Sequence, residues 1–87
     1  MWRLLFTKDA EKDMANLFSV APSTRKKVLE LLQIIQEDPR RPPYKALKGD
    51  LKGALSRRVN HKHRLVYEIL PEEKLVKVIR ALTHYGD

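Results

Sequence analysis

The residues best suited to chemistry are arginines and lysines in a stretch of the chain that contains no acid. From residue 53 to residue 66 the sequence has no Asp or Glu. The cations of that stretch are Arg57, Arg58, Lys62 and Arg64. The planar guanidinium group of arginine can hold a phosphate through two parallel hydrogen bonds. Cations without local carboxylate partners therefore indicate a site for a phosphate-bearing ligand.

The expected strand pattern decides which of these arginines can act together. In a strand over residues 54–59, Ser56 and Arg58 share one face, whereas Arg57 lies on the other. Burying charged side chains in strands this apolar is costly. We therefore expect Arg58, Arg64 and Arg80 to meet on an open or solvated face of the sheet.

A solvated sheet face is the simpler interpretation of the same arginines. Strand arginines commonly pair with acids in water, here with Glu68 and Glu72, and such pairs stabilise a fold very little. The lack of acids from residue 53 to residue 66 weakens this alternative and favours phosphate binding.

Two further groups of residues offer proton transfer or metal binding. Near the C-terminus, Thr83-His84-Tyr85 combines an imidazole that transfers protons near neutral pH with a ring that can stack on a base. A disordered tail or a packed tyrosine would explain the same residues. His61 and His63 have an H-x-H spacing, but no carboxylate or thiol accompanies them and nearby cations repel a divalent ion. We therefore expect neither a metal nor a cofactor.

Length and charge limit the class of protein. With 87 residues, 43% hydrophobic and 33% charged, the chain fits one globular domain over residues 1–87. Its 18 Lys and Arg against 11 Asp and Glu give a net charge of +7. This charge favours nucleic acid as a partner, with an anionic membrane or an acidic protein as alternatives. Without cysteine, and without the ~20-residue apolar run of a transmembrane helix or a signal peptide, we expect a cytoplasmic protein.

Hydrophobic periodicity predicts the elements that carry these residues. Apolar residues alternate at positions 2, 4 and 6, which predicts an N-terminal strand. Two helices follow, the first capped by Thr7 and the second by Ser23, and the second ends at Asp38-Pro39. The predicted core faces are Ala10, Met14, Leu17 and Phe18 in the first helix and Val28, Leu31, Leu32 and Ile35 in the second.

The C-terminal half has the pattern of strands separated by turns. Three prolines make residues 39–44 an irregular basic connector, and Gly49 and Gly53 mark turns. Strands are expected over residues 54–59, 63–69 and 75–82, the last two central because they are apolar on both faces. The fold class is therefore α+β: an N-terminal strand, a two-helix hairpin and three antiparallel strands, forming one sheet that the helices cover.

Four segments of the C-terminal half carry a resemblance to a known family. They are PYKALKGDLKG at residues 43–53, SRRVN at 56–60, HRLVY at 63–67 and THY at 83–85. In this order and spacing they closely resemble the YoeB/Txe branch of the RelE superfamily of toxins. The N-terminal strand and the helical hairpin agree with that family in length and order. The resemblance implies a small RelE-like, microbial-ribonuclease-like domain.

The resemblance also implies a function and its partners. Proteins of this branch are toxins of type II toxin–antitoxin systems that cut messenger RNA in the ribosomal A site without a metal, through the 2′-hydroxyl of the substrate. The implied partners are mRNA, ribosomal RNA and an antitoxin of the YefM/Axe kind. An acidic, partly disordered antitoxin segment is the natural inhibitor of a basic face. A second copy of the chain is a further candidate partner.

Residue roles follow when the family motifs are matched one by one. Arg58 of SRR and Arg64 of HRLVY would stabilise the scissile phosphate. His84 would protonate the departing 5′-oxygen as general acid, and Tyr85 would orient the substrate or stack on a base. The other cations expected to contact RNA are Lys48, Lys52 and Arg57.

The general base is where the sequence departs from the family pattern. The family commonly has glutamate in the pattern P-[FY]-E-x-L, where this chain has Lys45. A lysine with an unperturbed pKa of ~10.4 is a poor base at pH 7, but neighbouring cations disfavour its charged form and would let it accept a proton. Alternatively, Lys45 and Lys48 only hold the backbone, and catalysis is weakened or shared with a group such as Glu68. The sequence thus predicts an endoribonuclease, with a catalytically weak basic module that binds RNA, the ribosome or the antitoxin as the alternative.

Overall fold

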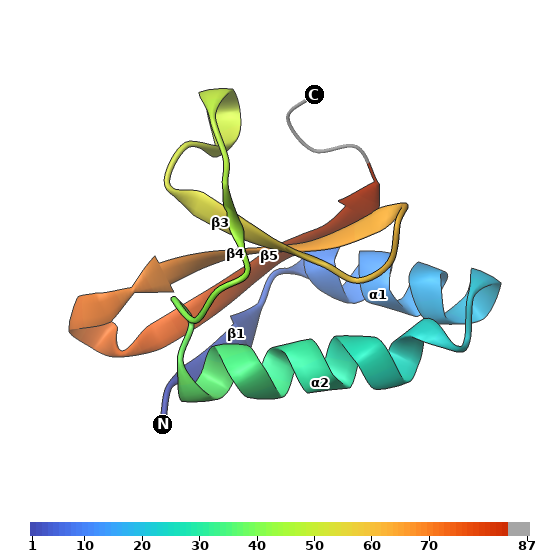
Figure 1. The fold of residues 1–87 in the computed structure, drawn as a ribbon, viewed down its shortest axis with the longest axis horizontal. Coiled ribbons are helices and arrows are strands. Elements are labelled where there is room, and N and C mark those ends of the chain that lie inside the picture. The colour runs from blue at the N-terminus through green and yellow to red at the C-terminus, as the bar shows by residue number, and fades with distance from the viewer. Residues whose placement is uncertain (84–87) are drawn as a thin grey trace.

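A five-stranded sheet covered on one face by two helices makes up the molecule (Figure 1). The computed structural model describes residues 1–83. The elements are β1 (Arg3–Phe6), α1 (Lys8–Val20), α2 (Thr24–Glu37), β2 (Lys45–Ala46), β3 (Ala54–Arg58), β4 (His63–Leu70) and β5 (Leu75–Thr83). Short 3-10 turns occupy Gly49–Leu51 and Pro71–Glu73. The predicted α+β class, with its order of strand, helix pair and strands, is confirmed.

The strand order β1-β5-β4-β3-β2 places the most apolar strands in the middle of the sheet. β1 is parallel to β5, and the pairs β5–β4, β4–β3 and β3–β2 are antiparallel. β4 and β5 are central, as their apolar residues on both faces predicted. The two-residue strand β2 was not predicted, because so short a segment has no hydrophobic period and is defined only by its pairing with β3.

The two helices begin in different ways. The Thr7 hydroxyl oxygen accepts a hydrogen bond from the backbone N–H of Ala10 (3.0 Å), so the predicted cap of α1 is confirmed. Ser23 stands at the predicted N-cap position of α2, but its backbone is already helical and its side chain makes no capping bond. The Thr24 hydroxyl instead donates to the carbonyl of Ala21 (2.7 Å) and fixes the reversal between the helices. Neither helix in the described part of the chain is long and apolar enough to cross a membrane.

The main core lies between the helices and the sheet. Its buried residues include Ala10 and Leu17 of α1, Val28, Leu31 and Ile35 of α2, and Leu65, Tyr67, Val76, Val78 and Ala81 of the central strands. The predicted helix faces are therefore confirmed, with Met14, Phe18 and Leu32 packed at the margin. The alternating residues of the first strand, Trp2, Leu4 and Phe6, pack against the same core.

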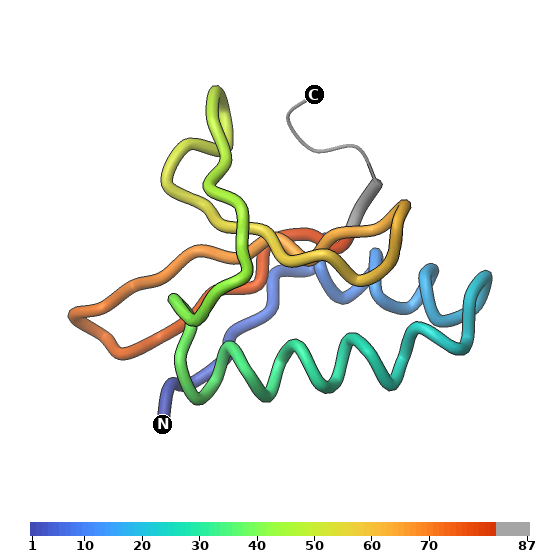
Figure 2. Tube along the Cα trace, in the orientation of Figure 1, coloured from blue at the N-terminus to red at the C-terminus, as the bar shows by residue number. Residues whose placement is uncertain are grey.

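A smaller apolar cluster lies on the other face of the sheet. Leu47, Ala54 and Val66 form its buried part, and Leu51 and Ile79 pack against it. It anchors the segment from residue 47 to residue 53, which rises from the sheet on the side away from the helices (Figure 2). Gly53, with a φ of 97°, closes this segment in a backbone conformation that side-chain-bearing residues avoid. The face beside this segment, which we call the open face, carries the candidate site.

Candidate functional site

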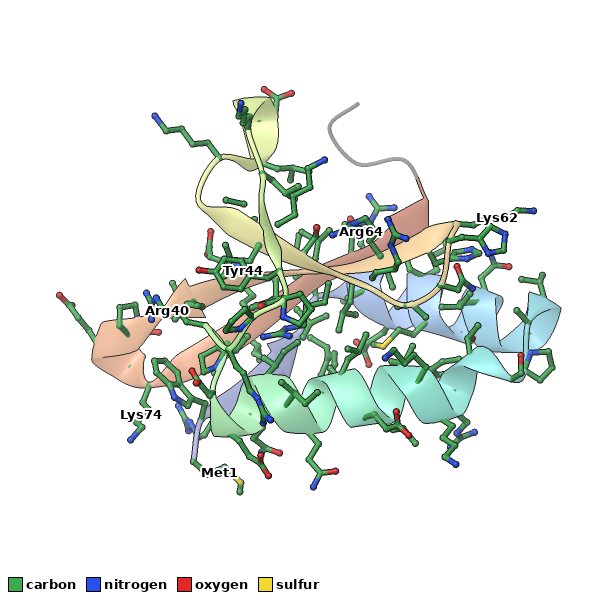
Figure 3. All side chains as sticks on the ribbon, in the orientation of Figure 1. Met1, Arg40, Tyr44, Lys62, Arg64 and Lys74 are labelled. Carbon is green, nitrogen blue, oxygen red and sulfur yellow. The ribbon has the colours of Figure 1, made fainter. Side chains whose placement is uncertain are left out.

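Arg64 is held in place on the open face by Ser56. Its Nε donates to the Ser56 hydroxyl oxygen (2.8 Å), and its Nη2 lies 3.5 Å from the Ser56 carbonyl oxygen. Ser56 is completely buried, so its hydroxyl is a fixed partner for a half-buried guanidinium. Figure 3 shows Arg64 on the side of the sheet opposite the helices. One hydrogen-bonded end of the side chain therefore orients the other for a ligand.

Arg58 lies directly opposite Arg64 in the pairing of β3 with β4. Residues opposite each other in an antiparallel pair share a face, so the predicted common face of these two arginines is confirmed. Within residues 1–83, neither guanidinium forms an ion pair with a carboxylate. Two like charges at this separation repel each other and weaken the sheet unless an anion comes between them. The pair is therefore suited to a phosphate group.

Both candidate general bases also lie on the open face. Lys45 in β2 is opposite Ser56 in β3, and Glu68 in β4 is opposite Ala54. Lys45 is exposed and Glu68 is half-buried. The register thus brings each of them to the face that carries Arg64. Lys48 and Lys52 are exposed in the neighbouring segment, as expected of RNA contacts.

Arg57 requires a correction, because it lies in the interior rather than on an RNA-binding surface. It is only 2% exposed, and its Nε donates to the Tyr67 hydroxyl oxygen (3.1 Å). Its Nη1 donates to the carbonyl of Pro43 (3.1 Å) and its Nη2 to the carbonyl of Arg41. These bonds commit the guanidinium to the connector between α2 and β2. Strand alternation puts Arg57 on the helix side of the sheet. Its hydrogen bonds to Tyr67 and to the connector carbonyls keep the guanidinium buried there.

Tyr67 extends this buried network to a third carbonyl of the connector. Its hydroxyl accepts from Arg57 and donates to the carbonyl oxygen of Pro39 (2.9 Å). Burial is the strongest influence on the Tyr67 hydroxyl and raises its pKa, while the charge and hydrogen bond of Arg57 act in the opposite direction. The hydroxyl therefore stays protonated as a donor. The network fixes the connector immediately before Lys45.

Arg80 also departs from the prediction, because it does not join Arg58 and Arg64. Its Nε donates to Asp13 Oδ2 (2.8 Å), its Nη2 lies 3.3 Å from Asp13 Oδ1, and its Nη1 lies 3.8 Å from Asp9 Oδ2. These acids belong to α1, so the guanidinium is directed to the helix. The pairing of β5 with β4 contains one extra residue, a β-bulge at Ile79, because Val66 lies opposite Arg80 and Tyr67 lies opposite Val78.

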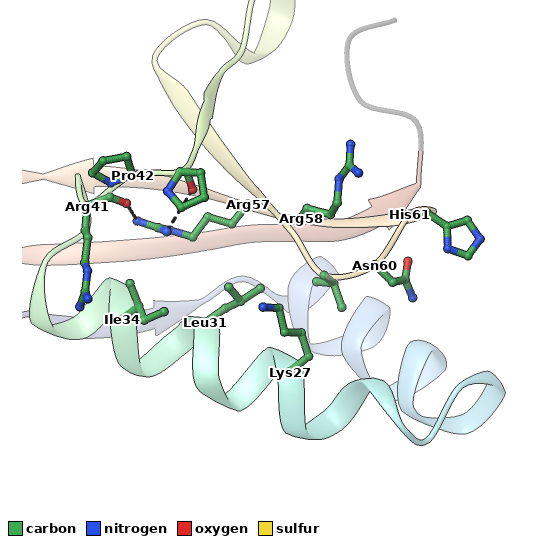
Figure 4. A pocket seen from close by; sticks show the side chains of 11 residues that line it. Lys27, Leu31, Ile34, Arg41, Pro42, Arg57, Arg58, Asn60 and His61 are labelled. Carbon is green, nitrogen blue, oxygen red and sulfur yellow. Dashed lines mark hydrogen bonds between the residues drawn. The ribbon is translucent and has the colours of Figure 1, made fainter.

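A cleft of about 500 Å³ lies between α2, the connector and the end of β3 (Figure 4). Leu31 and Ile34 of α2 line one side and Val59 the other. Lys27 extends from α2 into the cleft, and Arg41 points down from the connector toward the helix. The sequence reasoning missed both as binding residues. In the sequence, Lys27 could have been recognised only by its position one turn before Leu31, on the helix face that turns toward the sheet.

The remaining predicted residues are the two at the C-terminus and the histidines of the hairpin loop. His84 and Tyr85 lie outside the described residues. Asn60 Oδ1 accepts from the backbone N–H of Lys62 (2.8 Å) and of His63 (2.7 Å), which forms the predicted hairpin loop. Within residues 1–83, no three metal-ligating side chains are grouped closely enough to hold an ion.

Comparison with known proteins decides which family this geometry belongs to. Residues 6–85 match the family model of the YoeB-like toxin of bacterial type II toxin–antitoxin systems. The chain belongs to this family. Toxin YoeB of Streptomyces coelicolor is 33% identical over 85 residues, which cover 95% of this chain and 99% of that toxin.

Two solved structures of a YoeB from Staphylococcus aureus, each 30% identical, share the fold. The heterotetrameric YoeB–YefM toxin–antitoxin complex matches with a TM-score of 0.77 over 98% of this chain and 99% of that one. The YoeB dimer matches with a TM-score of 0.81 over 97% and 98% of the two chains. The likeness extends over nearly the whole YoeB-like toxin, so the arginine pair and the connector network lie within the shared fold.

Proposed function

We propose that this YoeB-like toxin is a metal-independent endoribonuclease that cuts messenger RNA in the ribosomal A site. The observation that carries the proposal is the opposed pair Arg58 and Arg64, which share the open face and have no carboxylate partner within residues 1–83. Such a pair suits the extra negative charge that a phosphate develops as it is attacked. Membership of a toxin family and the net charge of +7 support an RNA substrate.

The reaction needs a base, an acid and fixed positive charge. The base removes the proton of the substrate's 2′-hydroxyl, whose oxygen attacks the adjacent phosphorus. Arg64, oriented by Ser56, and Arg58 stabilise the pentavalent phosphate. His84 gives its proton to the departing 5′-oxygen, and Tyr85 orients the substrate or stacks on a base. The products are a 2′,3′-cyclic phosphate and a free 5′-hydroxyl.

The first experiment is primer extension on an mRNA translated in the presence of the purified protein. We expect a discrete cut with the wild type, and loss of the cut with Arg64→Ala and with His84→Ala. Lys26→Ala removes one charge from exposed α2 and is the matched control. Full cleavage by both variants would refute the assignment. If the wild type inhibits translation without cutting, the catalytically weak binding module is the correct function.

We assign the general base to Lys45 because β2 places it opposite Ser56, the residue that orients Arg64. Lys45→Ala should abolish cleavage, and Lys45→Glu, which restores the commoner family residue, should retain or raise it. Glu68→Gln should have little effect. If both Lys45 variants cleave like the wild type and Glu68→Gln does not, Glu68 is the base.

We propose that the regulator of this toxin is an antitoxin of the YefM/Axe kind with an acidic, partly disordered segment. The basic open face and the cleft with Lys27 and Arg41 give that segment cations to bind. The S. aureus toxin–antitoxin complex supports this partner, and the S. aureus dimer supports a second copy as another. Co-expression with a small acidic-tailed protein encoded beside the toxin should abolish cleavage and growth arrest.

A further inference from the structure

The cleft between α2, the connector and the end of β3 has apolar walls. Leu31 and Val59 are buried (5% and 6% exposed), and Ile34 is half-buried. Pro42 and Pro43 of the connector line the cleft as well. Within residues 1–83, the side chains that line it include no Asp or Glu. A cleft of about 500 Å³ has the size of a small-molecule site, in which apolar walls surround a few polar groups.

Two cations reach this cleft from different elements. Lys27 extends into it from α2, and Arg41 points from the connector toward the helix (Figure 4). Both residues are exposed, and within residues 1–83 neither side chain forms an ion pair. Two positive charges that line one cleft both attract an anion inside it.

A third cation, Arg57, is buried beside the cleft without a negative partner. It is 2% exposed and is one of the residues that line the cleft. Its acceptors are neutral: the hydroxyl of Tyr67 and the carbonyls of Pro43 and Arg41. In the described part of the chain no carboxylate pairs with it. Water screens a buried charge poorly, so the field of this guanidinium also favours an anion in the cleft.

Asn60 adds a hydrogen-bond donor of fixed orientation to the lining of the cleft. Its Oδ1 accepts from the backbone N–H of Lys62 (2.8 Å) and of His63 (2.7 Å), which holds the plane of the amide. Its Nδ2 makes no hydrogen bond within residues 1–83. A side-chain amide donor of this kind can bind the ring nitrogens and carbonyl oxygens at the edges of nucleobases.

We propose that the cleft binds one nucleotide of an RNA strand, with the base between the apolar walls and the phosphate at Lys27 and Arg41. A nucleotide joins a flat ring to a phosphate, which matches apolar walls combined with cations. An acidic peptide would match the cations too. However, a cleft bounded by α2, the connector and the hairpin loop suits one compact group better than an extended chain.

The cleft and the open face share one residue, which connects the two sites. Arg58 lines the cleft and lies opposite Arg64 on the open face. RNA held at this arginine pair therefore reaches the cleft by passing the end of β3. The inference rests on the proposed endoribonuclease function, because that function makes an RNA strand the source of the nucleotide.

Nucleotide binding is tested by NMR titration of the full-length protein, with the methyl signals of Leu31, Ile34 and Val59 as reporters of the cleft. At least one of AMP, GMP, CMP and UMP, at millimolar concentration, should shift these signals. Inorganic phosphate should bind at least about tenfold more weakly because it lacks the base. Equal binding of inorganic phosphate would mean a simple anion site and would overturn the inference. A lack of response to all four nucleotides would also overturn it, and a peptide of alternating Glu and Leu, titrated in parallel, would show whether the cleft takes an acidic peptide instead.

Lys27→Glu and Lys26→Glu are a matched pair of variants. They reverse the same charge at successive exposed positions of α2, and only Lys27 lines the cleft. Lys27→Glu should weaken nucleotide binding about tenfold or more, whereas Lys26→Glu should stay within about twofold of the wild type. Equal weakening by both variants would show that the net charge, and not the cleft, attracts the nucleotide.

A 2′-O-methyl RNA trinucleotide separates an RNA strand from a free nucleotide as the source of the ligand. Its methyl groups block the 2′-oxygens, so it binds without being cut. It should bind at least about tenfold more tightly than the mononucleotide and shift the Arg64 Nε–H signal together with the cleft methyl signals, because it occupies both sites. Arg64→Ala should weaken binding of the trinucleotide only. If the trinucleotide binds no more tightly and leaves the Arg64 signal unchanged, the cleft takes free nucleotides and is not an RNA subsite.

These titrations require no cleavage, so the inference and the proposed function can fail separately. If the wild type does not cut mRNA but the trinucleotide shifts both sets of signals, the endoribonuclease function fails and the RNA subsite remains. If the wild type cuts mRNA and the cleft signals respond to no nucleotide, the function remains and the inference is wrong.

Discussion

Arg57 and Arg58 are neighbours in the chain, yet they lie in opposite environments. Arg57 faces the helices, is 2% exposed and donates to Tyr67 and to two carbonyls of the connector. Arg58 faces away from them, is exposed, and lies opposite Arg64. One residue type in successive strand positions can therefore stabilise the fold on one face, as Arg57 does, and remain available to a ligand on the other, as Arg58 is.

The connector explains why a buried arginine is needed on the helix side. Prolines at 39, 42 and 43 prevent regular structure, so the carbonyl groups of this segment have no ladder of backbone N–H partners. Arg57 and Tyr67 together supply donors for three of these carbonyls. On the open face the donors are in excess instead of the acceptors, because the guanidinium groups of Arg58 and Arg64 have no carboxylate partner within residues 1–83. An RNA phosphate would supply acceptors there.

Arg57→Ala should give the largest loss of stability. It removes three hydrogen bonds of a buried charged group and leaves the connector carbonyls unsatisfied, at a cost of about 3 kcal/mol or more. Urea unfolding measures the loss. Arg58→Ala, one residue away, should change the free energy of unfolding by less than about 0.5 kcal/mol. Equal losses of unfolding free energy for the two variants would show that Arg57 stabilises the fold no more than Arg58 does.

Arg64→Ala should show the opposite pattern, with a large effect on activity and a small one on stability. Loss of one oriented donor to a developing phosphate charge should slow cleavage about 10²-fold, equivalent to about 2.7 kcal/mol. Single-turnover cleavage on ribosome-bound mRNA is the measurement. Ser56→Ala, which removes only the hydroxyl that orients Arg64, should also slow cleavage, but by a smaller factor. A variant lacking Arg64 that cuts normally would show that the open face is not the site of chemistry.

Tyr67→Phe tests the helix-side network without removing its charge. The ring stays in the core, but Pro39 loses its donor and Arg57 loses an acceptor, which should cost about 1–2 kcal/mol in thermal or urea unfolding. Tyr44→Phe is the control, since Tyr44 is 42% exposed. An unchanged midpoint for Tyr67→Phe would mean that water replaces the lost bonds.

Acid should weaken the attachment of α1 to β5. Burial of Asp13 acts to raise its pKa, but hydrogen bonds from Arg80 and the Ala81 N–H, with the charges of Arg80 and Lys12, outweigh it and lower the pKa below 3.8. The carboxylate therefore contributes its full stability above about pH 3.8, and loses it as pH falls through the lower folded value. Unfolding experiments from pH 7 to pH 2 should show this loss. Asp13→Asn should be less stable at pH 7 and lack this part of the pH dependence.

Lys27→Ala should have the smallest effect and should appear only in binding. Lys27 lines the cleft between α2 and the end of β3, which Arg58 also lines. Its loss should weaken ribosome binding a few-fold and lower the slope of log affinity against log salt concentration by about one. Lys26→Ala, on the next position of the same helix but outside this cleft, is the control. Identical binding by the two variants would mean that the cleft is not part of the basic binding surface.

The sequence by itself determined the elements and the side of the sheet on which most residues lie. The alternation of Trp2, Leu4 and Phe6, the helix stripes and the Thr7 cap are local patterns, and each was found where it was predicted. The same alternation separated Arg57 from Arg58. These features could be read from the chain because they depend on neighbours within one turn or one pleat.

Only the tertiary structure decided what the buried and bulged residues do. Arg57 is an anchor rather than an RNA contact because carbonyls 14 and 16 residues away lack other donors. Arg80 is directed to α1 because Asp13, 67 residues away in the chain, accepts its hydrogen bonds. β2 exists only through its pairing with β3. Each outcome depends on a polar group finding its partner across the fold, and hydrophobic periodicity contains no information about such partners.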